Sequence, residues 1–263
     1  MDLRPVEIRF RCGVGMTGCR RCFLLVFDLD GTLLDFSKSE QIALQKTLAA
    51  YGHTLSDAQT AEYTRINREE WRQFELGNQN KEETTVRRFQ RFLCGTALGV
   101  LFPLAAEINA RYLTNLSEIA ILEDHAYETL EKLQERGYRM GLLSNGVRRV
   151  QERRVALSGL KPFFTHILTS EEVGVGKPHP DMFLSILERF RTSPEESLYI
   201  GDSYESDILG AQAVGMETLW YRKDAAGLSG TGEDANKSDT FSDWRCFSRL
   251  LDERERRKFD ASC

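Results

Sequence analysis

The sequence of 263 residues lacks several features that would point to a membrane, secreted or nucleic-acid-binding protein. No apolar run approaches the roughly 18 residues that a membrane-spanning helix needs. The formal net charge is −5 and the pI about 5.6, so a nucleic acid polymer is not an expected partner. The N-terminus carries several arginines but no apolar stretch of the kind that marks a secretory signal. We expect a cytoplasmic protein without membrane partners, acting as a monomer or a small homo-oligomer.

Cysteine patterns that would carry chemistry are also missing. The chain has six cysteines, but disulfides are not expected in a chain of this length without an export signal. Cys19 and Cys22 have the spacing of half a metal site or of a redox pair, yet no second Cys/His pair with matching spacing follows, so we expect reduced thiols. Residues 1–22 match no element of the predicted fold. We expect a disordered extension, or a true start at Met16.

Two carboxylates follow the first apolar segment. Residues 23–27 predict a buried strand, and Asp28, Asp30 and Gly31 come directly after it. The carboxyl ends of parallel strands are where open α/β sheets bind ligands. One aspartate can attack phosphorus and form a covalent aspartyl phosphate, while the other protonates the leaving oxygen. A simple turn is the competing explanation. A calcium loop fits poorly, because its glycine would stand at the sixth position.

Helix and strand signals divide the chain into two regions. Capping boxes and helix-ending glycines between residues 37 and 116 predict four helices without an intervening strand. Strands and helices alternate over residues 117–251, which is typical of a parallel sheet covered on both faces. We therefore predict an α/β fold, with a Rossmann-like doubly wound parallel sheet built from residues 23–36 and 117–251. Residues 37–116 form a helical insertion, and residues 252–263 a charged, solvated tail.

Three boundaries are specific enough to be tested. Ser37 and Glu40 have the spacing of a capping box, which predicts the start of the first insertion helix. Residues 227–239 are polar and contain glycine, so they predict a loop. Residues 244–251 predict a closing helix.

Polar side chains also follow later strands. Ser144 and Asn145 come after the strand expected at 138–143, where they can hydrogen-bond a phosphate or cap the next helix. Lys177 stands between a glycine and a proline after a further strand. A solvated surface lysine is the usual interpretation. Here we expect a fixed ammonium that offsets the repulsion between carboxylates and a phosphate.

Two more carboxylates follow the strand expected at 197–201. Asp202 ends this strand, and Asp207 lies five residues further on. Together with Asp28 they predict an all-oxygen site of the kind that Mg²⁺ prefers. The alternatives are a turn residue for Asp202 and a favourable helix-start charge for Asp207; the latter explanation suits Asp207 better than Asp202.

These strand ends together resemble the four motifs of the haloacid dehalogenase superfamily, phosphatase division. The resemblance covers about residues 23–251, and the helical insertion falls where that superfamily places its first-type cap. The matching segments are Phe27-Asp28-Leu29-Asp30-Gly31-Thr32, Leu143-Ser144-Asn145-Gly146, Lys177-Pro178 and Gly201-Asp202-Ser203-Tyr204-Glu205-Ser206-Asp207.

The resemblance implies a role for each matching residue. Asp28 would be the nucleophile and Asp30 the general acid/base. Ser144, Asn145 and Lys177 would bind phosphate. Mg²⁺ would be held by the Asp28 carboxylate, the Asp30 backbone carbonyl and Asp202, with Thr32 and Asp207 in support.

A narrower resemblance concerns the insertion. Residues 66–77, with Trp71 and Phe74, are similar to the cap of the bacterial pyrimidine 5′-nucleotidases, and N-acylneuraminate 9-phosphatases share much of the pattern. The two aromatic residues could stack on a nucleobase, but at this helical spacing we expect them to be core residues.

The expected function is therefore a magnesium-dependent phosphatase acting on small phosphomonoesters, with nucleoside monophosphates favoured. Phosphatases of sugar phosphates or N-acylneuraminate 9-phosphate, and a phosphomutase, remain alternatives. Asp30 argues against a carbon–halogen hydrolase, because a halide leaves without a proton. A non-catalytic binding protein is disfavoured, because no catalytic carboxylate is missing.

Overall fold

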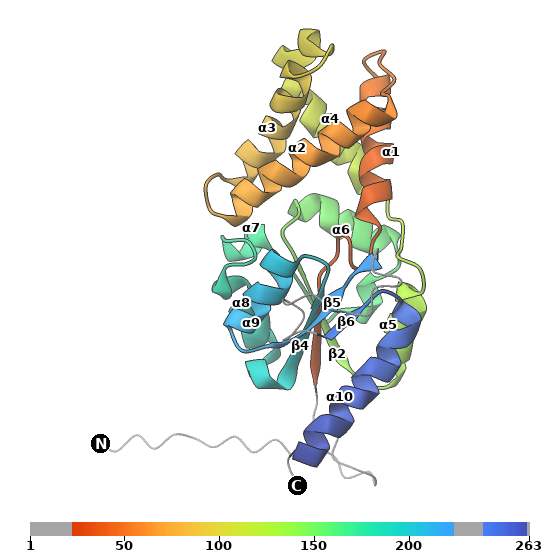
Figure 1. Ribbon diagram of the computed structural model, residues 1–263, viewed down its shortest axis with the longest axis vertical. Helices are drawn as coiled ribbons and strands as arrows, with labels where there is room; N and C mark the ends of the chain where they lie inside the picture. Colours follow the sequence, from red (N-terminus) through yellow and green to blue (C-terminus); the bar gives the residue numbers. More distant parts are fainter. Residues whose placement is uncertain (1–22, 224–238, 262–263) are drawn as a thin grey trace, which may run out of the picture.

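The computed structural model describes residues 23–223 and 239–261 of the chain. The expectations for residues 1–22, and for all but the last residue of the loop at 227–239, lie outside the described residues. The described chain forms a parallel sheet covered by helices, with a separate group of helices at one end of the sheet (Figure 1). The predicted Rossmann-like α/β core with a helical cap is confirmed.

The core sheet has six parallel strands, ordered β3-β2-β1-β4-β5-β6. They are β1 (Leu24–Phe27), β2 (Arg139–Ser144), β3 (His166–Thr169), β4 (Ser197–Gly201), β5 (Glu217–Tyr221) and β6 (Asp239–Phe241). The sequence pattern does not predict β6, because it has only three residues and begins with an aspartate. The strands β1, β2 and β4, which end in the candidate site residues, are adjacent in the sheet.

Strand β1 is buried on both faces. Leu25 and Phe27 pack into one hydrophobic cluster, and Leu24 and Val26 pack into another on the opposite face. Burial on both faces explains the continuous apolar run at residues 23–27, because neither face of the strand meets water.

Helices cover both faces of this sheet (Figure 1). They are α5 (Ala126–Glu135), α6 (Arg148–Leu157), α7 (Ser170–Val173), α8 (Pro180–Phe190), α9 (Gly210–Ala213) and α10 (Phe247–Ala261), with a π-helical turn η4 (Tyr204–Leu209) before α9. The helix expected at 244–251 differs from the prediction: a 3₁₀ turn at Trp244–Cys246 leads into α10, which continues through the expected tail. Arg254 within that segment donates to Glu217 and to the carbonyl of Thr218, so contacts with β5 hold this part of the helix.

The four expected insertion helices form the cap. They are α1 (Phe36–Ala49), α2 (Asp57–Glu75), α3 (Lys81–Cys94) and α4 (Ala105–Ser117), with a 3₁₀ segment at Gly99–Leu104 before α4. Capping boxes at Ser56 and Asn80 are present as expected. The predicted capping box at Ser37 is wrong, because the Asp35 side chain accepts from Lys38 N and begins α1 two residues earlier.

Two paired segments join the cap to the core. Asp35 N donates to the carbonyl of Ile121 at 2.8 Å, and Glu123 N donates to the carbonyl of Leu33 at 2.9 Å. The two linkers therefore form one antiparallel bridge, between Leu34 and Leu122. Among the described residues, none of the helices combines the length and the apolar character that a membrane span requires.

Candidate active site

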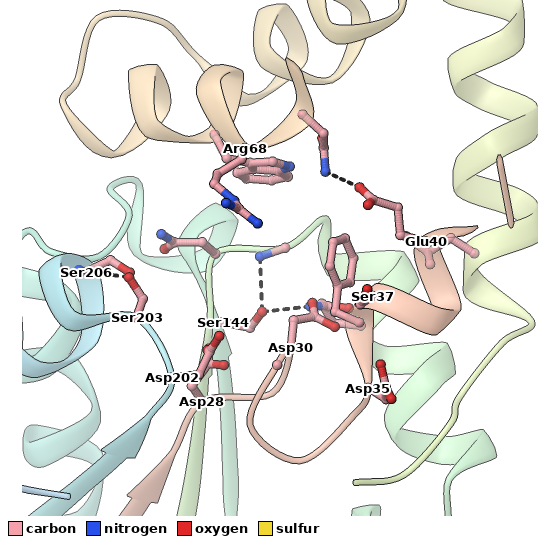
Figure 2. Close-up of a pocket in the computed structure, with 18 of the residues that line it drawn as sticks. Asp28, Asp30, Asp35, Ser37, Glu40, Arg68, Ser144, Asp202, Ser203 and Ser206 are labelled. Atoms are coloured by element: carbon pink, nitrogen blue, oxygen red, sulfur yellow. Dashed lines mark hydrogen bonds between the residues drawn. The ribbon is translucent and has the colours of Figure 1, made fainter. Parts of the chain in front are cut away.

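The carboxyl ends of the central strands and the underside of the cap enclose a cleft of about 690 Å³. Figure 2 shows Asp28 and Asp202 close together at the strand ends, with Arg68 reaching down from the cap helix α2. All eight site residues predicted from the sequence lie in or beside this cleft. The list is Asp28, Asp30, Thr32, Ser144, Asn145, Lys177, Asp202 and Asp207.

Lys177 is buried between two carboxylates. Its Nζ lies 2.5 Å from Asp28 Oδ1 and 2.6 Å from Asp207 Oδ1, and it also donates to the hydroxyl of Tyr199 at 3.1 Å. Burial opposes its charge, but Asp207 and Asp28 prevail and raise the pKa of Lys177 well above its usual range. Lys177 is 3% exposed, so the surface-lysine alternative is wrong and the expected fixed ammonium is present.

Asp207 serves mainly as an anchor for this ammonium. It is buried, and its Oδ2 accepts from Ser203 N at 3.0 Å while Oδ1 accepts from Lys177 and Tyr199. It lies in the first turn of the π-helical segment η4, where the sequence placed it, and its two oxygens are also engaged with Lys177, Tyr199 and Ser203 N. Gly201 makes this packing possible, because a Cβ there would lie 2.4 Å from Asp207 Oδ2.

Asp202 is held beside the loop that carries the two paired aspartates. Its Oδ1 accepts from Thr32 Oγ1 at 3.3 Å. Gly31 has a φ of +84°, and a Cβ on it would lie 2.4 Å from Asp202 Oδ2, so only glycine fits there. The Asp202 side chain is exposed to the cleft. Even so, loss of solvation by the surrounding protein raises the pKa of Asp202 well above its usual range, and the negative charges of Asp28 and Asp207 raise it further.

The carboxylates fit a hard divalent cation. Asp28, Asp202 and Asp207 each offer an oxygen, and these oxygens lie within 4.8 Å of one another. Asp28 Oδ2 is buried and has no hydrogen-bond partner among the described residues. Burial raises the pKa of Asp28 to about 7 against the opposing effect of Lys177, so full ionisation of the cluster calls for further positive charge. Because both Asp207 oxygens are engaged, Asp28 and Asp202 are better placed than Asp207 to hold a metal ion.

Asp30 is held by two side chains of α6. Gln151 Nε2 donates to Asp30 Oδ2 at 2.5 Å, and Arg154 forms an ion pair with Asp30 Oδ1. Neither partner was predicted from the sequence. The available signal was their spacing, since positions 151 and 154 share the buried face of α6 with Val150 and Val155.

Ser144 and Asn145 have different surroundings. Ser144 Oγ accepts from Gly146 N at 3.1 Å and from Gln151 Nε2 at 2.7 Å, so its own hydrogen remains for a ligand oxygen. The Asn145 side chain instead holds the backbone of Lys177, accepting from its N at 2.8 Å and donating to its carbonyl at 2.9 Å. A direct phosphate contact from Asn145 stays a prediction.

Three residues of α2 differ in their relation to the cleft. Trp71 is half-buried and lines the cleft, so the expectation that it belongs to the cap core is wrong. Phe74 packs against Gly176 of the core domain, where a Cβ on the glycine would lie 2.4 Å from the Phe74 ring. Glu75 lines the cleft next to Asn145, and burial raises its pKa to about 7, with Lys177 opposing.

The adjacent strands β1 and β4 end in carboxylates, and the buried ammonium of Lys177 lies beside them, at the edge where open α/β sheets bind ligands. The family model for haloacid dehalogenase-like hydrolases matches residues 24–215. The chain belongs to this family, and it is a phosphoric monoester hydrolase.

Its relatives include proteins from several organisms. It is 34% identical to the HAD-hydrolase YfnB of Bacillus subtilis over 78% of this chain and 86% of that one. A crystal structure of YfnB bound to magnesium has a TM-score of 0.77, covering 89% of this chain and all of that one at 31% identity. The pyrimidine 5′-nucleotidase PynA of Streptococcus pneumoniae is 33% identical over 75% of this chain and 82% of its own length. The glyceraldehyde 3-phosphate phosphatase of Pyrococcus furiosus is 31% identical over 77% of this chain and 82% of its own length.

Proposed function

We propose that the protein is a magnesium-dependent phosphatase that hydrolyses nucleoside 5′-monophosphates, with pyrimidine or non-standard bases, through an aspartyl-phosphate intermediate. The observation that carries this proposal is the buried contact of Asp28 with Lys177, beside a carboxylate oxygen to which no residue of the described chain hydrogen-bonds. This arrangement supplies a nucleophile, a cation to face a phosphate, and a place for a metal ion in one site.

The chain's own residues account for both half-reactions. In the first, a carboxylate oxygen of Asp28 attacks phosphorus as the bond to the leaving oxygen breaks, and Asp30 gives its proton to that oxygen. In the second, water attacks the phosphorus, Asp30 takes the proton, and Asp28 is released. In this proposal the Ser144 hydroxyl donates to a phosphate oxygen, and the positive charge of Lys177, held against Asp28, offsets the negative charge of the phosphate. Mg²⁺ held by Asp28, Asp202 and the Asp30 carbonyl would neutralise charge that develops on the phosphoryl group.

The substrate proposal is supported by the cap side of the cleft. Trp71 offers a ring surface there, and the guanidinium of Arg68 reaches into the cleft, where it can donate to a base carbonyl. Among the relatives, PynA is a pyrimidine 5′-nucleotidase. A second candidate is a sugar phosphate or sugar-acid phosphate, because another relative is a glyceraldehyde 3-phosphate phosphatase.

The test is phosphate release from a panel of phosphorylated metabolites, with Mg²⁺ and with EDTA, for the wild type and for Trp71→Ala. We expect Trp71→Ala to raise KM for nucleoside monophosphates by about 10-fold, since a stacked base contributes about 1–3 kcal/mol. KM for p-nitrophenyl phosphate should change little. Phe102→Ala is the matched control, because Phe102 is an exposed aromatic residue of the cap outside the cleft. Release mainly from sugar phosphates, or equal effects of both variants, would contradict the substrate proposal.

A further inference from the structure

One buried guanidinium connects the acid/base carboxylate to both cap linkers. Arg154 of α6 is fully buried and forms an ion pair with Asp30 Oδ1. Its Nε donates to the carbonyl of Ile119 at 3.0 Å, and its Cζ lies 5.9 Å from the centre of the Phe36 ring. Its remaining nitrogen, NH2, has no hydrogen-bond partner among the described residues. The contacts of Arg154 therefore extend well beyond a single ion pair.

The partners of Arg154 belong to both cap linkers and to the core. Phe36 is the first residue of α1, where the chain enters the cap. Ile119 lies two residues after α4, where the chain returns to the core. Asp30 belongs to the loop that follows β1 in the core. A shift of either linker changes the environment of the guanidinium that holds Asp30.

Gln151 completes the arrangement on the other carboxylate oxygen. Its Nε2 donates to Asp30 Oδ2 and to Ser144 Oγ, and its Oε1 accepts from Arg154 NH1 at 3.3 Å. Both oxygens of Asp30 are thus held from α6, although the Asp30 side chain is 24% exposed to the cleft. A carboxylate that must face a leaving oxygen has to be turned toward it, and these two donors set its direction.

We propose that Arg154 is a positioning residue that couples the position of the cap to the orientation of Asp30. The proposal rests on the proposed function, in which Asp30 gives a proton to the leaving oxygen as Asp28 displaces it. Arg154 touches neither the phosphate nor the leaving group; it acts through Asp30. Because the NH2 nitrogen has no partner among the described residues, it can form a new hydrogen bond when a linker moves. The guanidinium can then turn relative to Asp30 and still keep other partners.

The experiment compares two esters under single-turnover conditions with Mg²⁺, by following release of the leaving group. Uridine 5′-monophosphate releases uridine, whose 5′ oxygen needs a proton as it leaves, whereas p-nitrophenyl phosphate releases a stable p-nitrophenolate that does not. Arg154→Lys keeps the charge but cannot bind Asp30 and the carbonyl of Ile119 in the same fork geometry. We expect this variant to slow release from the nucleotide by at least about 10-fold, and release from the aryl ester by less than about 3-fold.

Two further variants keep the test decisive. Phe36→Leu retains Arg154 but removes the ring at the cap entry, so we expect the same ester-selective loss, smaller in size. Arg148→Lys is the matched control, because Arg148 is exposed on α6 and pairs with Glu152; neither ester should respond. Equal losses on both esters in Arg154→Lys and Phe36→Leu, or no loss, would overturn the coupling. If Asp28→Asn still releases both leaving groups at the wild-type rate, the proposed function itself fails, which is a different outcome.

Discussion

The cap and the core each bury a cluster of charged and polar side chains, and only the cap cluster satisfies its own hydrogen bonds. In the cap, Glu40 accepts from Thr64 and from Asn67, both at 2.6 Å. Arg88 donates to Asn67 and to Asn109, each at 3.0 Å. One carboxylate and one guanidinium thus share amide partners on four helices, and their charges balance.

The core cluster lacks this balance. Asp28, Asp202 and Asp207 face one ammonium, that of Lys177, and Asp28 Oδ2 has no partner among the described residues. An unsatisfied buried carboxylate is costly in a folded protein. The balanced cluster joins the four cap helices through hydrogen bonds, whereas the unbalanced cluster leaves a carboxylate oxygen for the metal ion and phosphate of the proposed function.

The sharpest way to test this contrast is Asp28→Asn, where we expect the largest effect. An amide does not form an aspartyl phosphate, so turnover should fall by on the order of 10⁴-fold or more. The unfolding free energy should change by less than about 1 kcal/mol, because Asp207 remains beside Lys177. Phosphate release and urea unfolding measure the two quantities. Near-normal turnover would exclude covalent catalysis by Asp28.

Arg88→Met should show the opposite pattern. Its removal leaves Glu40 and two buried amides without their cationic partner, so we expect the unfolding free energy to fall by about 3 kcal/mol. The rate with p-nitrophenyl phosphate should stay within about threefold of the wild type, because Arg88 belongs to the cap. Urea unfolding of Arg88→Met, of Glu40→Gln and of the double variant checks this. If the double variant loses as much unfolding free energy as the two single variants together, the two charges are not coupled.

Mg²⁺ should stabilise the folded protein through the core cluster. At 100 times its dissociation constant, a ligand that binds only the folded state adds about 2.7 kcal/mol. We expect the melting temperature to rise with Mg²⁺ and to return with EDTA, and Asp202→Asn to lose most of this rise. Glu131→Gln, which removes an exposed carboxylate of α5, should keep it. An equal rise in Asp202→Asn would remove Asp202 from the metal site.

The smallest effect is expected at the joint between the two regions. Although burial acts to raise it, hydrogen bonds from Lys223 and Lys38 lower the pKa of Asp35 to about 2. The folded pKa lies below the unfolded value of about 3.9, so ionised Asp35 stabilises the protein above about pH 4, and this contribution is lost as the pH falls toward about 2. Because Lys38 and Lys223 are exposed to solvent, which screens their charges, we expect this contribution to the unfolding free energy to be about 1 kcal/mol.

The measurement for Asp35 is acid unfolding. Asp35→Asn should show a shallower loss of stability between about pH 4 and pH 2 than the wild type. The same slope in both proteins would show that Asp35 does not titrate with folding. Asp57→Asn, on the exposed first turn of α2, is the control and should retain the wild-type slope.

Features that depend on local sequence were predicted well. The apolar run before Asp28 indicated a central strand because both faces of β1 are buried. Capping residues located α2 and α3, because a cap bonds to backbone groups only three residues away. The length of α10 was missed because its charged second half contacts residues of β5 that lie far away in the sequence.

The order of strands and polar residues along the chain is enough to predict that Asp28, Asp30, Lys177 and Asp202 lie at one edge of the sheet, since parallel strands bring their carboxyl ends together. How these groups are held depends on contacts between distant parts of the chain. Arg154 reaches Asp30 across 124 positions of the chain, and Trp71 faces the cleft instead of the cap core. Helical periodicity places a residue on a face of its own helix, but what that face meets depends on how the cap packs over the sheet.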